Sequence, residues 1–483
     1  MKKVTVFVIC IWAVTLAWAI TAPTLWAAEE FSLVTVKAFQ KNKAFYDDPR
    51  PLYLSDAINY KKILPPEVYA ELTYDVEAMK KVWAENTGFR APDVVGKIAP
   101  EIKPGTYSYK DKDKYPGLKA LMSEYHYNRF IPGGPPFAGN FPEIKIVPTK
   151  QYYYALPIAQ STKKHMGQTQ LDDKTGLIKE ETYSAGYPFP KPEGRFKANQ
   201  IYYNWLKRYC GWDSRYFIAE THGWTGSLRE DSISINTGWI LRLKGRVMKP
   251  YGFFDDRAKA EVEDRGISVS YISPRDMYGN VISQILYPEP DKWDQMMLYI
   301  GNLRRVRIMS STDVQDSVGG ADLIYLDNDG CSQKLSDTIF PSKMEMVAEL
   351  EMLLPTNHTG SAYLTSPSKG VEFHNLEWER RPVYVIKMIQ LDKNFVYSYR
   401  NLYLDKETLL LVFAENYDKR NRLYRTYESI LTFDFDMGMP VMGCTLAMDH
   451  IDLHSVSGKG FTMPTPWVGR EKVGLEYLFK KGK

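Results

Sequence analysis

The sequence predicts a mainly β protein with helices, an α+β fold organised around an antiparallel sheet. After Trp212, short runs rich in β-branched and aromatic residues follow one another, and polar turns separate them. Aromatic residues make up 14% of the 483 residues, a content that suits sheets and ligand-lining surfaces. The clearest strand pattern is a β-meander of four runs: 383–391, 395–404, 409–415 and 423–433. We expect the rest of the chain to be organised around this meander.

Both faces of the meander carry apolar side chains. Because successive side chains of a strand point to opposite faces, one face of the run 395–404 is expected to carry four aromatic residues: Phe395, Tyr397, Tyr399 and Tyr403. The opposite face carries Leu402 and Leu404. A sheet of this kind is either covered on both faces, or covered on one and left with an apolar hollow for a ligand. The pattern alone leaves both alternatives open.

The N-terminus has the pattern of a secretory signal peptide, which we place at residues 1–28. Two lysines precede the apolar run 4–22, and cleavage is expected after Ala27 or Ala28. The alternative is an uncleaved membrane anchor, because the run is just long enough to span a bilayer. Cys10 is not preceded by the small residue of a lipoprotein signal. We therefore expect a mature periplasmic protein without a lipid anchor.

Residues 29–211 are expected to form an N-terminal region of helices and Pro/Gly-rich wrapping segments. Apolar residues recur on one helical face over Tyr74–Glu85 and again over Phe196–Tyr209. The second helix either lies across the sheet as a lid or packs on it, and we favour packing. Between the two helices, the run Pro132–Pro136 is incompatible with helix or central strand.

Two strand patterns after Trp212 carry basic residues. The run Trp239–Val247 alternates, and its basic side chains share a face that we expect to be solvated: Arg242, Lys244 and Arg246. A hairpin about Gly301-Asn302 is expected to place Tyr299 opposite Arg304, within reach of a cation–π contact.

The composition and the motifs exclude several functions. With 62 basic and 58 acidic side chains, the net charge of +4 leaves no electrostatic footprint for nucleic acid. The sequence has no nucleophile elbow, phosphate-binding glycine loop, His-Glu-x-x-His or Cys-x-x-Cys motif, so we predict no catalytic residue and no cofactor. Three cysteines follow the signal peptide and allow at most one disulfide: Cys210, Cys331 and Cys444. The run His450–His454 is the best metal candidate, but a polar strand face or a subunit contact is favoured and no metal is predicted.

Other charged residues have a functional and a structural interpretation. An ester hydrolase would need a nucleophile beside a base, for which three histidines are candidates: His126, His222 and His374. The run Arg304–Arg307 either binds an anionic headgroup or forms the solvated face of a hairpin. Around the start of the meander, a charged group predicts exposed salt bridges at the rim of the sheet: Glu377, Glu379, Arg380 and Arg381.

Several segments carry a resemblance to a known family. They are Ser273–Gly279, Leu298-Tyr299 with Leu303–Arg307, Gly319–Asp329, Glu379–Val385, Tyr397–Arg400 and Glu415–Asp418. Together they resemble the pattern of LolA-like outer-membrane lipoprotein-sorting domains and of an exported family catalogued as a domain of unknown function, DUF1329. The likeness covers most of the chain, from about Tyr74 to His454.

The resemblance implies a curved antiparallel sheet over residues 212–456 that forms an unclosed half-barrel with helices on its concave side, followed by a tail, 457–483. In LolA and LolB proteins the hollow holds lipoprotein acyl chains in transit across the periplasm. The resemblance therefore implies a non-enzymatic periplasmic carrier for a lipid, a lipoprotein or another hydrophobic molecule. The aromatic and basic candidates for ligand binding are Trp239, Tyr299, Arg304, Arg305, Phe395, Tyr397, Tyr399 and Tyr403.

The anchoring cysteine of LolB-type acceptors is absent. Its absence favours a soluble shuttle, or a partner of an inner-membrane exporter and an outer-membrane protein, and association with the outer membrane stays open. The alternative function is a non-enzymatic assembly component of an envelope transport complex.

Overall fold

The computed structural model describes residues 60–64, 66–131, 141, 143–309, 314–317, 322–358, 363–366, 370–373, 376–466 and 468–481. The chain divides into two compact units. In the first unit the structure describes two short helices, α4 (Tyr60–Ile63) and α5 (Pro66–Leu72). The second unit holds every described residue from Thr73 onward. The predicted signal peptide, 1–28, lies outside the described residues.

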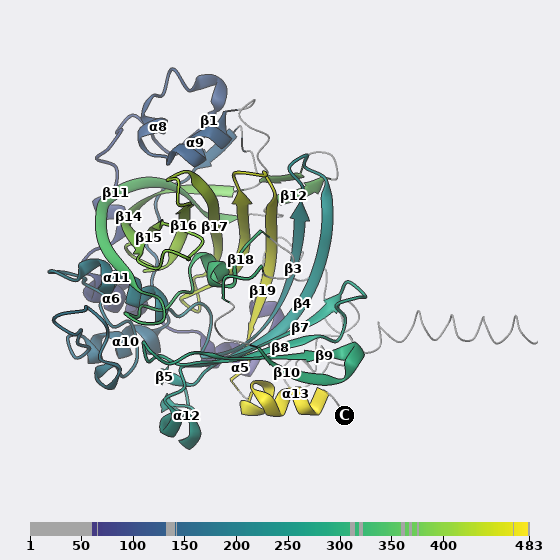
Figure 1. The fold of residues 1–483 in the computed structure, drawn as a ribbon. Coiled ribbons are helices and arrows are strands. Elements are labelled where there is room, and N and C mark those ends of the chain that lie inside the picture. The colour runs from purple at the N-terminus through teal and green to yellow at the C-terminus, as the bar shows by residue number, and fades with distance from the viewer. Residues whose placement is uncertain are drawn as a thin grey trace, which may run out of the picture. The chain divides into compact units, whose positions relative to one another are not determined.

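One sheet of 15 strands dominates the second unit (Figure 1). Its strands in chain order are β1 (Gly105–Ser108), β2 (Glu143–Ile146), β3 (Ser214–Trp224), β4 (Glu230–Arg242), β7 (Arg265–Ser273), β8 (Val281–Leu286), β9 (Gln295–Ile300), β10 (Arg305–Met309), β11 (Ser342–His358), β14 (Leu376–Gln390), β15 (Tyr399–Asp405), β16 (Leu411–Tyr417), β17 (Leu423–Asp434), β18 (Met439–Asp449) and β19 (Ser455–Pro464). Their spatial order is β1-β2-β14-β15-β16-β17-β18-β19-β3-β4-β7-β8-β9-β10, with β11 paired to β14. The end strands β1 and β10 do not pair with each other among the described residues, so the sheet is open. Its described pairings are antiparallel except that of β2 with β14.

Helices and short connections complete the unit. The helices are α6 (Val76–Thr87), α7 (Ala91–Val94), α8 (Gly117–Ala120), α9 (Glu124–Phe130), α10 (Leu156–His165), α11 (Lys197–Leu206), α12 (Asp256–Glu261) and α13 (Leu475–Lys481). Single 3₁₀ turns are η1 (Tyr109–Asp111), η2 (Glu180–Thr182), η3 (Gly301–Leu303) and η5 (Arg470–Lys472), and a longer kinked one is η4 (Tyr325–Gly330). Two small ribbons pair β5 (Lys244–Arg246) with β6 (Gly252–Phe253) and β12 (Tyr363–Ser366) with β13 (Gly370–Phe373). In the described part of the chain, the search for a helix both long and apolar enough to cross a bilayer finds none.

Both predicted helices are confirmed, and local chemistry accounts for their ends. The α6 helix begins at Asp75, whose Oδ1 accepts the Ala78 N–H at 2.6 Å, and ends at Gly88 in the left-handed conformation. The α11 helix packs on the sheet, as favoured, and its buried side chains include Ile201 and Trp205.

The meander is confirmed, but its second strand begins later than predicted. Strands β14 to β17 pair in sequence, and the register sets Ile386 beside Leu402 and Leu402 beside Ala414. Residues 395–398 are not part of β15. Asp392 Oδ1 accepts the Asn394 N–H at 2.8 Å, which fixes a turn there.

The meander is covered on both faces by described residues. Leu402 and Ala414 lie in a buried cluster with α11 and with Cys331. On the opposite face, Phe413 stacks on Tyr125 of α9, with ring centroids 5.2 Å apart. Here the sheet therefore takes the first alternative that its pattern allowed, a core packed from both sides.

The basic face predicted after Trp239 is not solvated. Arg242, Lys244 and Arg246 are each at most 5% exposed. Lys244 Nζ donates to Glu180 Oε2 at 2.9 Å, and Arg242 Nε lies 3.3 Å from Asp213 Oδ1. The alternation itself was predicted correctly. Nothing in the neighbouring sequence indicates that acidic side chains from other segments pack against this basic face.

The predicted hairpin register is wrong by two residues. The structure pairs Arg305 with Ile300 and Val306 with Tyr299. The connection has four residues, because η3 turns the chain at Gly301 and Arg304 adopts the left-handed conformation with φ 48°. Tyr299 and Arg304 are therefore not cross-strand neighbours, and the cation–π contact expected of that pairing has no basis in the register.

Three of the four charges predicted at the rim are buried, whereas Glu377 is half-buried and pairs with Lys150 at 2.8 Å. Glu379 and Arg381 are both 0% exposed, and Arg380 is 7% exposed. Ala91 and residues 150–152 of the N-terminal region cover them. The Glu379 carboxylate accepts the Lys150 N–H and pairs with Arg381. The Ala91 N–H donates to Glu407, which also pairs with Arg381.

The predicted C-terminal tail, 457–483, begins inside the sheet. Strand β19 lies between β18 and β3 and pairs with both. The α13 helix then packs against β8 and β9 (Figure 1).

Candidate ligand-binding site

One part of the sheet buries its serines and leaves its aliphatic residues half-buried. Ser268 and Ser283 are 0% exposed, and Ser270 is 4% exposed. They face the C-terminal segment: Ser268 Oγ donates to the Lys472 carbonyl at 2.8 Å, and Ser283 Oγ accepts the Gly474 N–H at 2.7 Å. The small hydroxyl side chains thus let α13 and the residues before it approach the sheet closely.

The opposite face of the same strands is aliphatic. The half-buried side chains on it, named the aliphatic face below, are Ile240, Ile267, Val269, Ile282 and Leu298. The register places them together, because Ile240 pairs with Ile267, Val269 pairs with Ile282, and Ile282 pairs with Leu298. The serine side also buries Val281, Ile285 and Met297, so the core lies on that side and the aliphatic face is the more exposed of the two. Burying such a surface against an apolar ligand would be favourable, at ~25 cal/mol per Å².

Two of the predicted ligand-binding residues lie on the serine side. Trp239 is 2% exposed and pairs with Ser268, and the Lys472 Nζ lies 5.0 Å from its ring centroid. Tyr299 is 6% exposed and pairs with Val281 on that same side. The structure therefore encloses both side chains next to the C-terminal segment.

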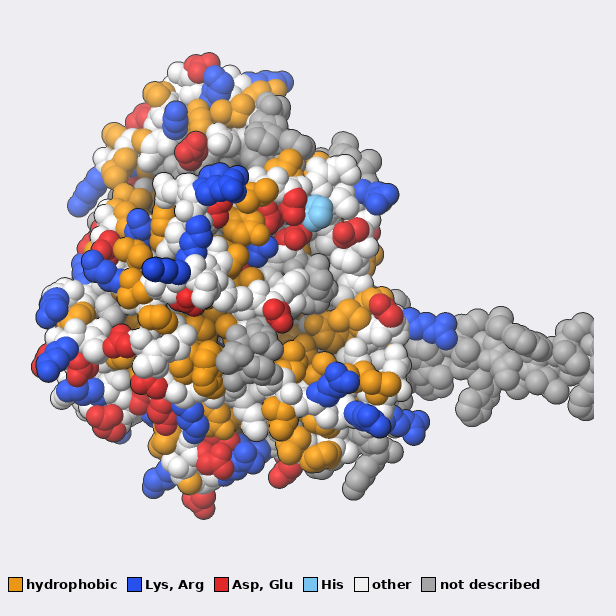
Figure 2. All heavy atoms as spheres, in the orientation of Figure 1, with side chains coloured by type: hydrophobic (Ala, Val, Ile, Leu, Met, Phe, Trp, Pro, Cys, Tyr) orange, Lys and Arg blue, Asp and Glu red, His pale blue; other side chains and the backbone are white. Residues whose placement is uncertain are grey.

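The predicted basic candidates lie at the sheet's end. Arg304 and Arg305 are exposed, on the turn before β10 and at its first residue. Figure 2 shows hydrophobic and basic side chains side by side over the region where Figure 1 places β9, β10 and α13. Exposed apolar residues there include Ile308, which is 76% exposed, and Phe479, which is 55% exposed.

The four aromatic residues of the meander do not share a face. Tyr397 is 0% exposed and donates to Asp327 Oδ2 at 2.6 Å, in a buried cluster with Phe395. Tyr399 and Tyr403 lie on the other side of β15: Tyr403 donates to Glu415 Oε2 at 3.1 Å, and Tyr399 stacks on Tyr417. The split arises because residues 395–398 turn before the strand begins. A role for these four in ligand binding stays a prediction.

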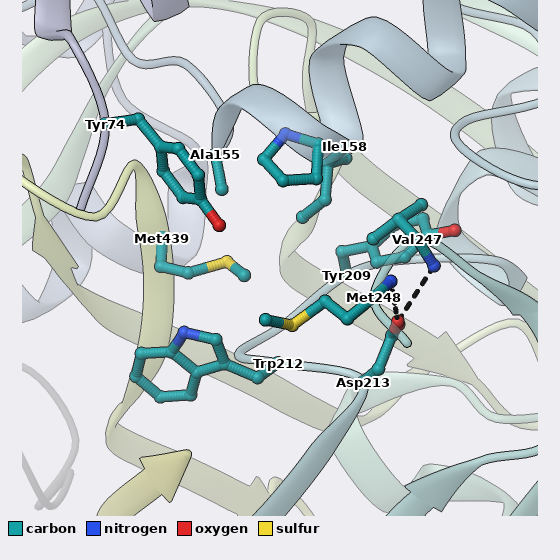
Figure 3. A pocket seen from close by; sticks show the side chains of 10 residues that line it. Tyr74, Ala155, Ile158, Tyr209, Trp212, Asp213, Val247, Met248 and Met439 are labelled. Carbon is teal, nitrogen blue, oxygen red and sulfur yellow. Dashed lines mark hydrogen bonds between the residues drawn. The ribbon is translucent and has the colours of Figure 1, made fainter. Parts of the chain in front are cut away.

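A small pocket lies beside the segment that joins α11 to β3 (Figure 3). Its volume is about 280 Å³, including space open to solvent, and its lining residues are Tyr74, Ala155, Pro157, Ile158, Tyr209, Trp212, Asp213, Val247, Met248 and Met439. Asp213 Oδ2 accepts the N–H groups of Val247 and Met248 at 2.8 and 2.9 Å, which fixes one wall. Only about 10 Å³ of that space can hold the centre of a water molecule, so the pocket has room for about one water and not for a hydrocarbon chain.

The wall that includes Ala155 and Met439 depends on a glycine. Gly438 has φ 62° and its carbonyl accepts the Ala155 N–H at 2.7 Å. A Cβ at this position would lie 2.8 Å from the Ala155 N atom and 2.7 Å from Met79 Sδ.

We expect Gly438→Ala to destabilise the protein by about 1–3 kcal/mol, because both the positive φ and the close backbone contact resist a side chain. Urea unfolding followed by circular dichroism measures the change. Gly252→Ala is the control, because Gly252 has a similar φ of 75° with no atom within 4 Å of its Cβ position. Equal losses in both variants would contradict the role of the close contact.

Two of the three histidines considered as bases have structural partners: His222 binds Glu230 and lies 2.8 Å from Glu220 Oε1, and His126 also has two. His126 Nδ1 lies 2.8 Å from Ser123 Oγ, and its Nε2 lies 2.9 Å from Glu428 Oε1. The same Ser123 Oγ accepts the His126 N–H as the cap of α9, and Glu428 also binds Arg129 at 2.6 Å. The group thus links α9 to β17, a contact over 302 residues that the sequence did not indicate. His374 lies outside the described residues.

The residues near His454 contain ligand types that suit a divalent cation. His454 Nδ1 lies 2.9 Å from Asp322 Oδ2 and 3.8 Å from Asp452 Oδ2. His450, predicted on the same face, is separate and lies 3.0 Å from Thr426 Oγ1. Asp452 is exposed, Asp322 and His454 are half-buried, and the ligand atoms of the three lie within 4.8 Å of one another.

The comparisons with known proteins place the chain in a family. The family model described as a protein of unknown function, DUF1329, matches residues 138–462. The chain belongs to this family, which confirms the resemblance found in the sequence. The search of curated protein sequences returns no match.

Several solved structures are similar at low identity. A domain from Vibrio parahaemolyticus assigned to the outer membrane lipoprotein-sorting proteins is 16% identical, with a TM-score of 0.38, and the match covers 54% of this chain and 89% of that one. A DUF1329 family protein from Desulfovibrio piger is 14% identical, with a TM-score of 0.39, and the match covers 55% of this chain and 91% of that one. A LolA superfamily protein from Nitrosomonas europaea is 11% identical, with a TM-score of 0.34, and the match covers 58% of this chain and 98% of that one.

Proposed function

We propose that the protein is a periplasmic binding protein or carrier for a hydrophobic molecule, such as a lipid or the acyl chains of a lipoprotein. The observation that carries the proposal is the aliphatic face, which remains half-buried while the serines behind it are enclosed by the C-terminal segment. The open sheet around this face would act as the half-barrel that the resemblance implies. Affinity would come from burial of apolar surface, which contributes ~0.8 kcal/mol per methylene and needs no catalytic group.

The proposal is tested by native mass spectrometry of the mature protein purified from its own envelope, followed by extraction and identification of bound molecules. A stoichiometric hydrophobic molecule that is released on denaturation would support it. A protein that carries no ligand and takes up no fluorescent fatty acid would contradict it, and would favour the assembly component of an envelope complex.

One substitution tests whether the ligand binds on the aliphatic face. Val269→Asp puts a charge in the middle of the aliphatic face, and we expect the affinity for a fluorescent fatty acid to fall at least tenfold, because a carboxylate cannot be buried against an acyl chain at low cost. The measurement is a fluorescence titration, with circular dichroism to show that the fold is retained. Ile308→Asp is the matched control on the exposed side of β10, and an equal loss in both variants would rule out the aliphatic face.

A further inference from the structure

Three arginines project from neighbouring strands at one end of the aliphatic face. Arg215 of β3 pairs with Ile240, so its side chain lies on the side of Ile240 and Ile267. Arg242 is two residues further along β4 on that side and pairs directly with Arg265 of β7. The register alone therefore places three guanidinium groups next to an apolar surface.

A fourth arginine joins them from the segment after α11. Arg208 forms an ion pair with Asp329 of η4, and the backbone carbonyl of Arg208 accepts a hydrogen bond from Arg242. Arg215 lies against this segment, because a Cβ on Gly211 would be 3.0 Å from its Cδ. The segment 208–215 thus holds the group together.

The four arginines have too few acidic partners. Arg242 faces Asp213, and Arg208 faces Asp329. Asp264, the acidic partner of Arg265 at 3.7 Å, is shared with Lys207 at 3.4 Å. Arg215 makes no side-chain hydrogen bond or ion pair with the described residues. Positive charges held close together in partly buried positions repel one another, and an anion placed among them would relieve the repulsion.

The electrostatics of Arg265 and Arg215 agree with this imbalance, whereas for Arg242 burial is outweighed by two tyrosines and by Asp213 and Asp264, which raise its pKa. Burial, together with the neighbouring arginines and against the opposing effect of Asp264, lowers the pKa of Arg265 to about 9. Burial also lowers the pKa of Arg215, and Arg208 and Arg242 add to the shift. Both groups remain charged at neutral pH.

A ligand can reach Arg215 directly, whereas Arg208 and Arg265 are buried, each 8% exposed. The side chain of Asp329 is 63% exposed although it pairs with the buried Arg208, and Arg215 is half-buried. An anionic group arriving along the aliphatic face would meet Arg215 first and could take the place of Asp329 beside Arg208.

We propose that Arg208, Arg215 and Arg265 bind the anionic headgroup, a carboxylate or a phosphate, of an acidic amphiphile whose hydrocarbon chain lies on the aliphatic face. This inference rests on the proposed function, and it narrows the ligand from any hydrophobic molecule to an acidic one. It also places the basic contacts on β3, on β7 and in the segment after α11, and not beside β10, where Arg304 and Arg305 lie.

The test compares hexadecanoate with hexadecan-1-ol, which share a chain length and differ in the headgroup, as competitors of one fluorescent fatty acid. We expect the acid to bind at least tenfold more tightly, because a charge-assisted hydrogen bond contributes ~1.5–3 kcal/mol. Equal affinities would overturn the headgroup site and leave the carrier function in place. If neither competitor binds, the proposed function itself fails.

Three variants locate the site. Arg215→Gln is expected to lower the affinity for the acid at least tenfold, to leave the affinity for the alcohol unchanged, and to leave the melting temperature unchanged or higher, because an unpaired cation is removed. Asp329→Asn should raise the affinity for the acid, because it removes a competing carboxylate. Arg422→Gln, at an exposed arginine that pairs with Asp418, is the control and should change neither affinity. A lower melting temperature of Arg215→Gln with both affinities intact would show a purely structural arginine and overturn the proposal.

Inorganic phosphate distinguishes a headgroup site from a site for a free anion. If millimolar phosphate displaces neither the probe nor hexadecanoate, the hydrocarbon chain is required for binding, as proposed. Displacement of hexadecanoate by phosphate, with a phosphate affinity that Arg215→Gln abolishes, would instead assign the arginines to a free anion and overturn the link to the aliphatic face.

Discussion

Replacement of Arg381 by Met is expected to destabilise the protein by about 3–5 kcal/mol, the cost of removing one partner from a buried ion network. The guanidinium donates to Asp405 Oδ2 at 2.7 Å, to Glu407 Oε2 at 2.8 Å and to the Lys150 carbonyl at 2.7 Å. It also lies 3.5 Å from Glu379 Oε2. Without Arg381, Asp405 and Glu407 would remain buried without the cation that binds both, and Glu379 would keep only Lys150 Nζ, 3.5 Å away.

The network is also the attachment of the N-terminal region to the sheet. Glu407 accepts the N–H groups of Ala91 and Tyr152, each at 2.8 Å, so its carboxylate joins two distant segments to the turn after β15. We therefore expect Arg381→Met to loosen residues 91 and 150–152 together with the meander. Hydrogen exchange would show this as faster exchange at Ala91 and Tyr152 than at α13.

Urea unfolding at pH 7 measures the loss of stability, and Arg422→Met is the control. Arg422 pairs with Asp418 at 2.7 Å but is 52% exposed, so its removal should cost no more than ~1 kcal/mol. The loss in Arg381→Met should be smaller at pH 4 to 5, because protonation of the unpaired carboxylates removes the buried charge. Burial already raises the pKa of Glu407 in the intact protein, with Arg381 opposing the shift. A loss below 1 kcal/mol at pH 7 would contradict the buried network.

The sequence predicted the parts of the fold that depend on local pattern. The meander, α6 and α11 were found because their side-chain periodicity and end signals lie within a few residues. The hairpin at Gly301 failed by two residues, since a two-residue turn and a four-residue turn with Arg304 in the left-handed conformation give similar patterns. The alternation could indicate a strand but could not indicate the register.

The candidate site could not be predicted from the sequence, for a different reason. A strand in which Ile267 and Val269 alternate with Ser268 and Ser270 usually buries its aliphatic side chains and exposes its serines. The structure shows the reverse, because the C-terminal segment packs on the serine side from about 200 residues away. Burial of Arg381 was missed in the same way, since the covering segments lie more than 200 residues before it.

The stability of the unit should also depend on pH through Glu428. This carboxylate is 2% exposed and binds Arg129 at 2.6 Å and His126 at 2.9 Å, which ties α9 to β17. Burial alone would raise its pKa, but Arg129 and His126 outweigh burial and lower the pKa to about 2. A carboxyl group with a depressed folded pKa contributes stability that is complete above its unfolded pKa of 4.5 and is lost as the pH falls toward 2.

We therefore expect Glu428→Gln to cost roughly 3 kcal/mol at pH 7, because Arg129 keeps its charge in a buried position without a counter-ion. As the pH falls from 4.5 to 2 the intact protein loses the same contribution, so the two free energies of unfolding should converge. Urea titrations at several pH values between 2 and 7 measure the difference, and Glu345→Gln, at an exposed pair with Lys343, is the control that should follow the intact protein. A difference that stays constant down to pH 2 would mean that the Glu428 carboxylate does not hold α9 to the sheet through its charge.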